Sequence, residues 1–234
     1  MQVSKKDIKT GLRALGLKKG DNVGVHSSLS SFGFVEGGAV AVIDALLEVV
    51  GEEGTIVMPT YSTNRIEVER TPEEIVMGVT WKFKILPFDP KEIPCWTGII
   101  PETFRKRKDA LRSLHPTHSI AVIGAKAKEI AEAGKELSAL GGWRKLLELN
   151  GYILLIGVGL DRCSSMHLAE ERFKLPKNIL DKITLPQELK EKYPEEGWDV
   201  GFGPYPDFTR MEEPYLKQKI MKIVKIGKAT VKLA

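Results

Sequence analysis

YILLIGVGLDRCSSMHLAE, at residues 152–170, joins a short apolar run to a glycine-containing turn and a polar segment. The first five residues are all apolar, which is typical of a strand that is covered on both faces of a parallel sheet. The two serines before His167 predict the start of a helix, because a serine there accepts a hydrogen bond from a first-turn amide. His167 would lie near the positive end of that helix, which disfavours its protonated form. A general base at pH 7 must be neutral, and Glu170 would share the helical face of His167 and orient its imidazole.

The same alternation of apolar run, polar loop and helix recurs along the chain. An N-terminal helix is expected because Ser4 and Asp7 form a capping pair and Gly16 is placed to end it. The other expected elements are strands at residues 22–26, 55–58, 120–123 and 152–156 and helices at residues 38–50 and 125–137. This pattern predicts an α/β sandwich with a largely parallel central sheet.

Two long segments interrupt the alternation. Residues 62–101 and 174–207 are polar, contain several prolines and show no clear periodicity. Long excursions of this kind usually form lids or binding loops. We therefore expect them to form the substrate side of a site and to close over it from opposite sides. Since no repeat or low-complexity linker divides the chain, residues 1–234 are expected to form a single domain.

The charge of the chain is mild and mixed in sign. The formal net charge is +4, and lysines alternate with glutamates rather than forming a basic stripe. The basic clusters at residues 105–108 and 217–228 are therefore predicted to be solvated helix faces, and no nucleic-acid partner is expected. No apolar run approaches the ~20 residues that cross a bilayer, and the N-terminus has no apolar signal core. We therefore expect no membrane partner and a cytoplasmic location.

Cysteine and histidine are sparse. The two cysteines, Cys95 and Cys163, give no disulfide framework, and the four histidines show no metal-ligand spacing. We therefore expect no metal. Cys163 is interpreted as a small buried residue rather than as a nucleophile.

Three polar corners follow predicted strands, at residues 26–30, 59–62 and 157–167. Ligands of open parallel sheets collect at the carboxyl ends of the strands, so we expect these corners to converge on one site. The serines of the first corner could present hydroxyls and amides to an anionic or amide-containing ligand, or could simply cap a helix. The third corner does not complete a dinucleotide fingerprint, because Arg162 occupies the position of the third glycine.

The turn before residue 120 holds further candidates. Arg112 carries a guanidinium group that can bind a phosphate with two hydrogen bonds. His115 either contacts a ligand or locks the turn before Pro116, and His118 either contacts a ligand or is exposed. The same choice between a structural and a chemical role applies to His167.

The chain as a whole resembles the aminoglycoside 3-N-acetyltransferases and their relatives. This resemblance rests on the order and spacing of several motifs, which together extend over nearly the whole chain. The motifs are HSSLSSFG at 26–33, GTIVMPT at 54–60, FDP at 88–90, TGIIPETFR at 97–105, RSLHP at 112–116 and LAE at 168–170. The resemblance implies a three-layer α/β/α fold, acetyl-CoA as the donor, and direct transfer of the acetyl group to an amine.

The resemblance also implies roles for individual residues. His167 would be the base that deprotonates the attacking amine, and Glu170 would support it. A carboxylate from residues 207–213 would complete the site, with Glu213 preferred to Asp207 and Glu212. Backbone amides of the serine loop would stabilise the oxyanion. The residues expected to hold acetyl-CoA are Ser28, Leu29, Ser30, Arg112, Ser113, His115 and Ser119.

The acceptor is less defined than the donor. The chain is shorter than typical drug-modifying members of the family, and its glutamates at 67–74 are interrupted by Arg70 and preceded by Arg65. A polycationic aminoglycoside calls for a net acidic pocket, so we expect either an aminoglycoside or another small-molecule amine. A homodimer is left open. Two other functions also stay open: a non-catalytic CoA-binding module, and a hydrolase that uses His167 with Cys163 or a serine.

Overall fold

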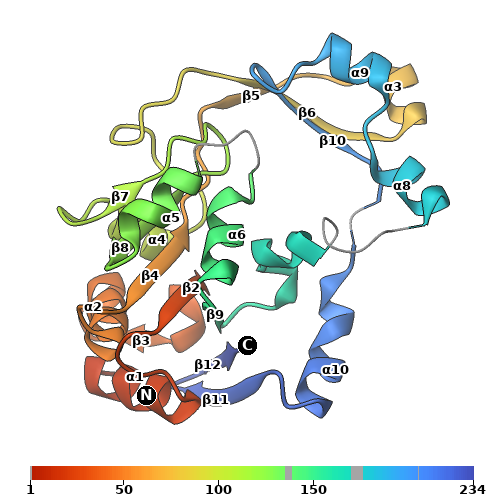
Figure 1. Ribbon diagram of the computed structural model, residues 1–234. Helices are drawn as coiled ribbons and strands as arrows, with labels where there is room; N and C mark the ends of the chain where they lie inside the picture. Colours follow the sequence, from red (N-terminus) through yellow and green to blue (C-terminus); the bar gives the residue numbers. More distant parts are fainter. Residues whose placement is uncertain (1, 135–138, 170–175, 205) are drawn as a thin grey trace.

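The computed structural model describes residues 2–134, 139–169, 176–204 and 206–234 (Figure 1). The strands in these ranges are β1 (Gln2–Val3), β2 (Asn22–Ser27), β3 (Phe34–Val35), β4 (Thr55–Pro59), β5 (Arg65–Glu67), β6 (Val79–Ile85), β7 (Leu111–Arg112), β8 (Ile120–Gly124), β9 (Tyr152–Ile156), β10 (Trp198–Phe202), β11 (Lys222–Ile226) and β12 (Ala229–Leu233). The α-helices are α1 (Lys5–Leu15), α2 (Gly38–Val50), α3 (Pro72–Met77), α4 (Ile99–Arg105), α5 (Ala127–Ala133), α6 (Gly141–Glu148), α8 (Lys177–Ile183), α9 (Gln187–Lys192) and α10 (Glu212–Lys217). Four short 3₁₀ helices are also described: η1 (Leu29–Phe32), η2 (Leu160–Arg162), η3 (Ser164–His167) and η4 (Phe208–Met211).

The local predictions hold for most of these elements. Helix α1 begins with the expected capping box, in which the Ser4 side chain accepts from the Asp7 amide and the Asp7 carboxylate accepts from the Ser4 amide. It ends at Gly16, whose φ of 107° lies in the left-handed region that glycine favours. Helix α2 and strand β9 have the predicted bounds. Helix α5 ends at Ala133, and the end predicted for it at residue 137 falls outside the described residues.

A seven-stranded sheet forms the centre of the described structure, in the order β11-β12-β9-β2-β4-β8-β7. Only the pairings of β2 with β9 and with β4 are parallel, whereas the other four are antiparallel. The prediction of a largely parallel sheet is therefore wrong, although the α/β class is confirmed. The physical reason is the connections: the short turns between β7 and β8 and between β11 and β12 reverse the chain, whereas the α2 crossover keeps β2 and β4 parallel.

Helices pack on both faces of this sheet. On one face, Ile56 and Met58 of β4 share a buried cluster with residues of α1 and α2. The intervening residue Val57 faces the other way and packs with Ile130 of α5 and Trp143 of α6. This alternation follows from the two-residue period of a strand, and it buries β4 completely. The parallel strands β2, β4 and β9 end at the same edge of the sheet. Helices cover both faces of the sheet to which these strands belong.

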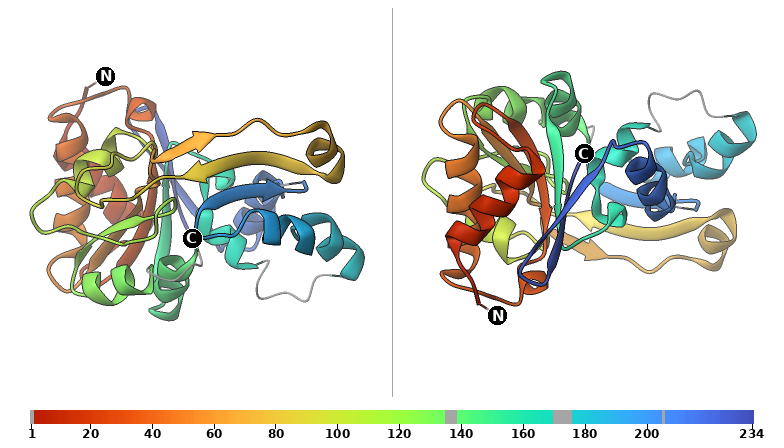
Figure 2. Two further views of the ribbon diagram at one scale, coloured as in Figure 1. Left: turned by 90° about the horizontal axis from the view of Figure 1, so that it is seen from above. Right: turned by 90° about the horizontal axis from the view of Figure 1, so that it is seen from below.

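The two segments that lacked periodicity form a regular structure together. We call residues 64–86 and 177–203 the lobe; its three strands have the order β10-β6-β5, and Figure 2 shows it extending away from the large sheet. Strands β6 and β10 pair antiparallel, with Val200 opposite Lys82. The expectation of two irregular segments on opposite sides is therefore wrong. The alternation of apolar and polar residues that marks a strand is broken in β6, because a buried position holds a lysine, Lys82. It pairs with Glu74 at 2.6 Å.

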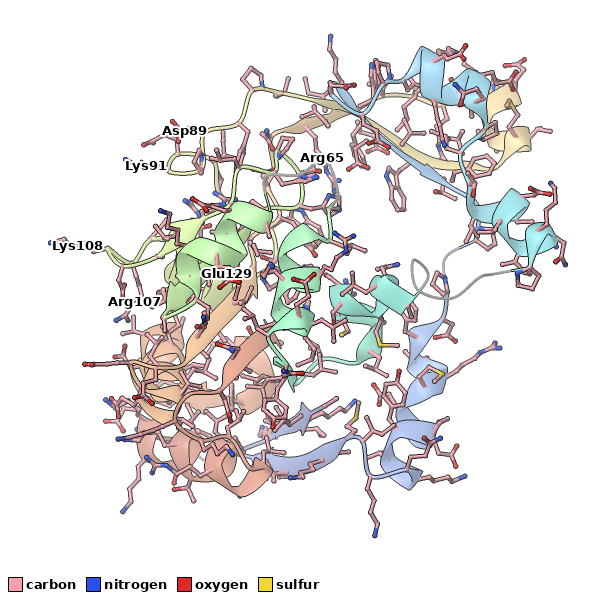
Figure 3. The ribbon with its side chains drawn as sticks, viewed as in Figure 1. Arg65, Asp89, Lys91, Arg107, Lys108 and Glu129 are labelled. Carbon is pink, nitrogen blue, oxygen red and sulfur yellow. The ribbon has the colours of Figure 1, made fainter. Side chains whose placement is uncertain are left out.

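The basic cluster at residues 105–108 is mostly at the surface, as predicted. Arg107 pairs with Asp44 at 2.7 Å, and Lys108 points outward in Figure 3. Arg105 is the exception, because it is buried and pairs with Glu102 at 2.6 Å. None of the helices in the described ranges has the length and apolar character needed to cross a bilayer.

Candidate active site

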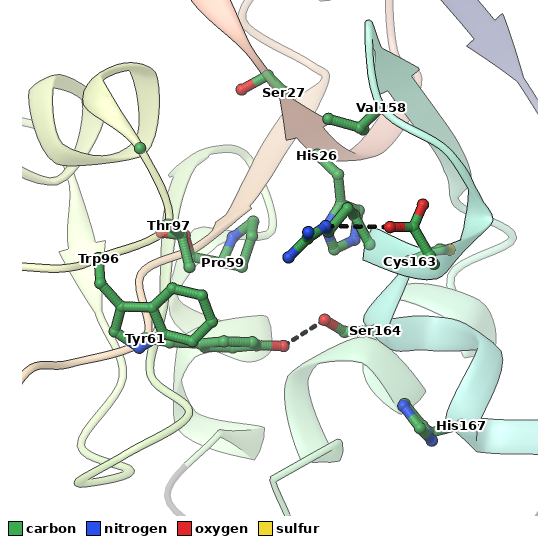
Figure 4. Close-up of a pocket in the computed structure, with 13 residues that line it drawn as sticks. His26, Ser27, Pro59, Tyr61, Trp96, Thr97, Val158, Cys163, Ser164 and His167 are labelled. Atoms are coloured by element: carbon green, nitrogen blue, oxygen red, sulfur yellow. Dashed lines mark hydrogen bonds and ion pairs between the residues drawn. The ribbon is translucent and has the colours of Figure 1, made fainter. Parts of the chain in front are cut away.

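The three predicted corners converge on one pocket, with a volume of about 460 Å³. Its lining includes His26 and Ser27 after β2, Pro59 and Tyr61 after β4, and residues between 158 and 167 after β9. Convergence follows from the parallel arrangement of these three strands, whose carboxyl ends share one edge. The segment 96–98, from the long insertion expected at residues 62–101, supplies a fourth wall. Figure 4 shows the side chains of this pocket.

His167 lines the pocket and lies directly before the α-helical residues Leu168 and Ala169, close to the predicted helix start. It is the last residue of the 3₁₀ helix η3, whose N-cap is Cys163 and which has no side-chain cap. The predicted capping by the two serines is therefore wrong, because their hydroxyls have other partners. Ser165 contacts the Cys163 sulfur at 3.3 Å, and Ser164 accepts a hydrogen bond from Tyr61. The His167 ring meets Phe208 edge-on, with the centroids 5.0 Å apart.

Tyr61 is a pocket residue that the sequence did not single out. Its hydroxyl donates to the Ser164 hydroxyl at 2.5 Å and so connects the end of β4 to η3 (Figure 4). Burial raises the pKa of Tyr61 to about 12, so the phenol stays protonated. A tyrosine after a buried strand carries no distinctive motif, and its partner is 103 residues away in the sequence.

We expect Tyr61→Phe to lower the free energy of unfolding by about 1 kcal/mol, since it deletes one buried hydrogen bond without creating a cavity. Urea denaturation measures this change. Tyr152→Phe is the matched control, because Tyr152 is partly exposed and far along β9 from the pocket, and it should change stability by less than about 0.5 kcal/mol. Equal stabilities of the two variants would contradict the assigned role of the bond.

His26 is buried in the floor of the pocket. Its ring stacks on Trp143 at 5.0 Å, and its Nε2 has no hydrogen-bond partner among the described residues. Burial lowers the pKa of His26 to about 4, so the imidazole is neutral at pH 7.

This burial makes the stability of the protein depend on pH. Between pH 6.5 and pH 4 the unfolded chain protonates His26 but the folded chain does not, so acidification favours unfolding by about 3 kcal/mol. We expect His26→Phe, which keeps a ring against Trp143, to lose this part of the pH dependence. Denaturation at pH 7, 5.5 and 4 measures it. Below pH 4.5 the carboxylates also titrate, so the comparison is made above that pH. If the free energy of unfolding changes with pH equally in the wild type and in His26→Phe there, the prediction is contradicted.

A second groove, of about 540 Å³, adjoins the pocket and contains the serine loop. Ser28, Leu29 and Ser30 all line it, as the donor prediction requires. Ser27 and Gly98 line both the groove and the pocket, so the two cavities meet at these residues.

Arg112 does not reach either cavity. Its guanidinium donates to the carbonyl oxygens of Pro90, Ile93 and Thr60 and to the hydroxyl of Ser119. Burial lowers its pKa to about 10, and each of its three nitrogens donates to an acceptor within the protein. Arg112 thus fixes the loop at residues 88–93 against the sheet, and it is absent from the lining of both cavities.

The remaining residues of that turn line neither the pocket nor the serine groove. Ser113 and Ser119 are buried, and their hydroxyls bond to the backbone at Ile120 and Thr60. His115 accepts from the amides of Thr117 and His118 through Nδ1, which is the turn-locking role. The other histidine of the turn, His118, is half-buried and packs edge-on against Tyr61, with the ring centroids 4.8 Å apart.

The predicted carboxylates do not line the pocket in the described structure. Glu213 is exposed on α10 and pairs with Lys217 at 2.6 Å. Glu212 faces the core instead, where it accepts from the Leu160 amide and from Lys232. Asp207 caps the η4 turn through the Thr209 amide. Glu170 lies outside the described residues.

Asp161 is the carboxylate that does line the pocket. It pairs at 3.1 Å with Arg162, another lining residue. The described lining thus carries one carboxylate and one guanidinium group, whose charges offset each other.

Comparison with known proteins places this arrangement in a family. The profile described as aminoglycoside 3-N-acetyltransferase matches residues 25–234. The chain is 36% identical to the SPbeta prophage-derived aminoglycoside N(3')-acetyltransferase-like protein YokD of Bacillus subtilis (strain 168), over 98% of this chain and 87% of that protein. It is 33% identical to aminoglycoside N(3)-acetyltransferase III of Serratia marcescens over 72% of this chain, a match that spans 64% of that enzyme.

Solved structures agree with the sequence comparison. The crystal structure of aminoglycoside acetyltransferase AAC(3)-Xa superposes with a TM-score of 0.79 and 26% identity, over 99% of this chain and 88% of that one. A structure described as AAC-IIIb binary with CoASH superposes with a TM-score of 0.76 and 25% identity, over 100% of this chain and 92% of that one. Sequence and fold therefore agree that this chain belongs to the aminoglycoside 3-N-acetyltransferase family, a family of acyltransferases.

Proposed function

We propose that the protein transfers an acetyl group from acetyl-CoA to the nitrogen of a small-molecule amine, with His167 as the general base. One observation carries this proposal: the pocket that holds His167 meets the serine-lined groove at Ser27 and Gly98. A donor in the groove could therefore place its thioester beside an acceptor in the pocket. In this proposal residues 1–234 act as one acetyltransferase domain, with the lobe on its substrate side.

The acceptor must first lose its ammonium proton to the solvent, because an ammonium group has no lone pair with which to attack. The neutral nitrogen would then form a bond to the carbonyl carbon of the thioester while His167 takes the further proton that this nitrogen loses on becoming an amide. The carbon–sulfur bond breaks, and the imidazolium returns its proton to the departing thiolate. The products are an amide and the free CoA thiol, and the histidine is neutral again. Positioning both substrates in adjoining cavities contributes to the rate as well.

The donor side is supported by the groove residues and by family membership. Backbone amides of residues 28–30 are proposed to stabilise the oxyanion, with one restriction: the Ser28 amide already donates to the Ile156 carbonyl at 2.9 Å. Among the relatives, the structure described as AAC-IIIb binary with CoASH contains that ligand, which supports a CoA donor here.

The acceptor side favours an amine of low positive charge. The lining acid Asp161 is paired with Arg162, so the described lining has no excess negative charge to attract a polycation. Glu74, one of the glutamates expected near the substrate, is buried in the lobe against Lys82. An aminoglycoside or a related amino compound remains the proposed class, and low-charge members of it should be the better substrates.

The hydrolase alternative has weaker support. Cys163 is 4% exposed, and burial raises the pKa of its thiol, so the thiolate that would act as a nucleophile is disfavoured. Ser164 accepts from Tyr61 rather than contacting a histidine.

A thiol-release assay separates these functions. Acetyl-CoA is incubated with aminoglycosides, polyamines and amino sugars, and free CoA thiol is followed with a thiol reagent. We expect release only when an amine is present, together with an acetylated product in the mass spectrum. Release without an amine would indicate a hydrolase. Binding of acetyl-CoA with no product from any amine would indicate a non-catalytic module.

A further inference from the structure

We infer that Trp96 binds the acceptor through a cation–π contact, in which a second ammonium group of the amine lies on the indole face while the reacting nitrogen faces His167. This inference rests on the proposed function, and it names a specificity-determining residue that none of the sequence motifs contains. It addresses a question that the pocket raises, namely how a cationic amine is held by a lining whose carboxylate, Asp161, is paired with Arg162.

Trp96 presents apolar surface inside the pocket. It lines the cavity and is 51% exposed, and among the described lining residues it is the one large apolar side chain that is more than half exposed. Single exposed apolar residues are common on a flat surface, whereas an aromatic side chain in a concave site is typical of a ligand contact. A ligand on the indole would remove this surface from water.

The backbone around Trp96 is fixed to the end of β4. The Trp96 amide donates to the Tyr61 carbonyl at 3.0 Å. The next residue, Thr97, donates through its hydroxyl to the Pro59 carbonyl at 2.5 Å. Strand β4 is completely buried, so both acceptors belong to a well-supported part of the core. An aromatic side chain on a backbone held in this way loses little conformational entropy when it binds a ligand.

The charges beside the indole allow a further cation to bind. The Arg65 guanidinium carbon lies 6.0 Å from the centroid of the Trp96 ring, at the outer limit of a cation–π contact. Arg65 lies closer to the Phe83 ring, at 4.1 Å, and pairs with Asp199 at 2.8 Å. Its positive charge is therefore offset by a carboxylate. Tryptophan is the aromatic side chain that binds cations best, so an ammonium group in the pocket would be attracted to this ring.

The position of Trp96 relative to His167 suits a compact amine with two amino groups. Figure 4 shows these two side chains on different sides of the pocket. Tyr61 connects the two sides: its ring centroid lies 6.0 Å from that of Trp96, and its hydroxyl donates to Ser164 of the 3₁₀ helix that ends at His167. An acceptor that spans the pocket would therefore place one nitrogen at His167 and a second on the indole.

Two ring-shaped acceptors test the inference: 2-deoxystreptamine, which carries a pair of amino groups, and glucosamine, which carries a single one. Steady-state KM and kcat are measured for both with acetyl-CoA as the donor. We expect Trp96→Leu, which keeps an apolar side chain without a π system, to raise KM for 2-deoxystreptamine by about tenfold and to leave kcat within about twofold. Trp96→Phe should raise this KM by about threefold, because phenylalanine binds cations less well. With glucosamine both variants should match the wild type.

Leu114→Ala is the matched control, because Leu114 is 52% exposed and lines neither the pocket nor the serine groove. Its KM values for both acceptors should stay at those of the wild type. The KM for acetyl-CoA should be unchanged in all the variants, since the indole is assigned to the acceptor. An unchanged KM for 2-deoxystreptamine in Trp96→Leu, or an equal rise with both acceptors, would overturn the inference.

A binding measurement separates this inference from the proposed function. A wild type that acetylates no amine contradicts the proposed function. Calorimetry with 2-deoxystreptamine then tests the contact with Trp96 by itself. A loss of affinity in Trp96→Leu supports the contact, whereas an unchanged affinity, or no binding to the wild type, overturns it.

Discussion

We expect His167→Ala to lower kcat for acetyl transfer by about 10³-fold, within the range that a positioned general base contributes. The reason is that the other lining groups cannot replace it: the Nε2 of His26 is buried and Tyr61 stays protonated. Affinity for CoA should be unchanged, because His167 lines the pocket and not the serine groove. Thiol release measures kcat, and calorimetry with CoA measures binding.

Imidazole in the buffer distinguishes a missing base from a damaged fold. A cavity left by alanine in this open pocket should admit free imidazole and recover part of the activity, and only in the variant. Tyr152→Phe, remote from the pocket, should keep wild-type turnover. Wild-type turnover in His167→Ala would remove the base from the mechanism, and loss of CoA binding together with turnover would assign His167 a structural role.

We expect Glu74→Gln to lower the free energy of unfolding by about 3–5 kcal/mol, the cost of removing one partner of a buried ion pair. Glu74 accepts hydrogen bonds from Lys82 of β6 and from Lys192 and Tyr193 at the end of α9, and so joins α3 to two other parts of the lobe. Burial alone would raise the pKa of Glu74, but these hydrogen bonds lower it well below its usual range. Without the charge, Lys82 is buried at 4% exposure with no counter-ion.

Chemical denaturation followed by tryptophan fluorescence reports this change, since Trp81 and Trp198 lie in the strands of the lobe. Glu73→Gln is the matched control, because Glu73 is its exposed neighbour on α3 and should change stability by less than about 0.5 kcal/mol. Replacing Glu74 and Lys82 together with apolar residues should recover part of the loss. A Glu74→Gln variant as stable as Glu73→Gln would show that the lobe does not depend on the pair.

The candidate site was predictable where its residues lie close to a strand end. Three corners, at residues 26–30, 59–62 and 157–167, were expected to meet, and they line the pocket. Arg112 and Glu213 do not line the pocket, and the sequence could not show this because a charged side chain has the same sequence signature whether it faces a ligand, the solvent or the protein interior. Only the folded structure shows that the Arg112 guanidinium donates to the carbonyl oxygens of Pro90 and Thr60, which are distant in the sequence.

The amino-acid sequence by itself determined the local elements of this protein. Helix α1 with its Ser4–Asp7 capping box, helix α2 and the apolar strand β9 depend on hydrogen bonds and burial patterns that span a few residues, so nearby side chains suffice to specify them. The tertiary structure alone decided the direction of most sheet pairings, the assembly of the lobe from β6 and β10, and the bond between Tyr61 and Ser164. These features join residues far apart along the chain, and their free energy arises only when the folded core brings two surfaces together and removes water between them.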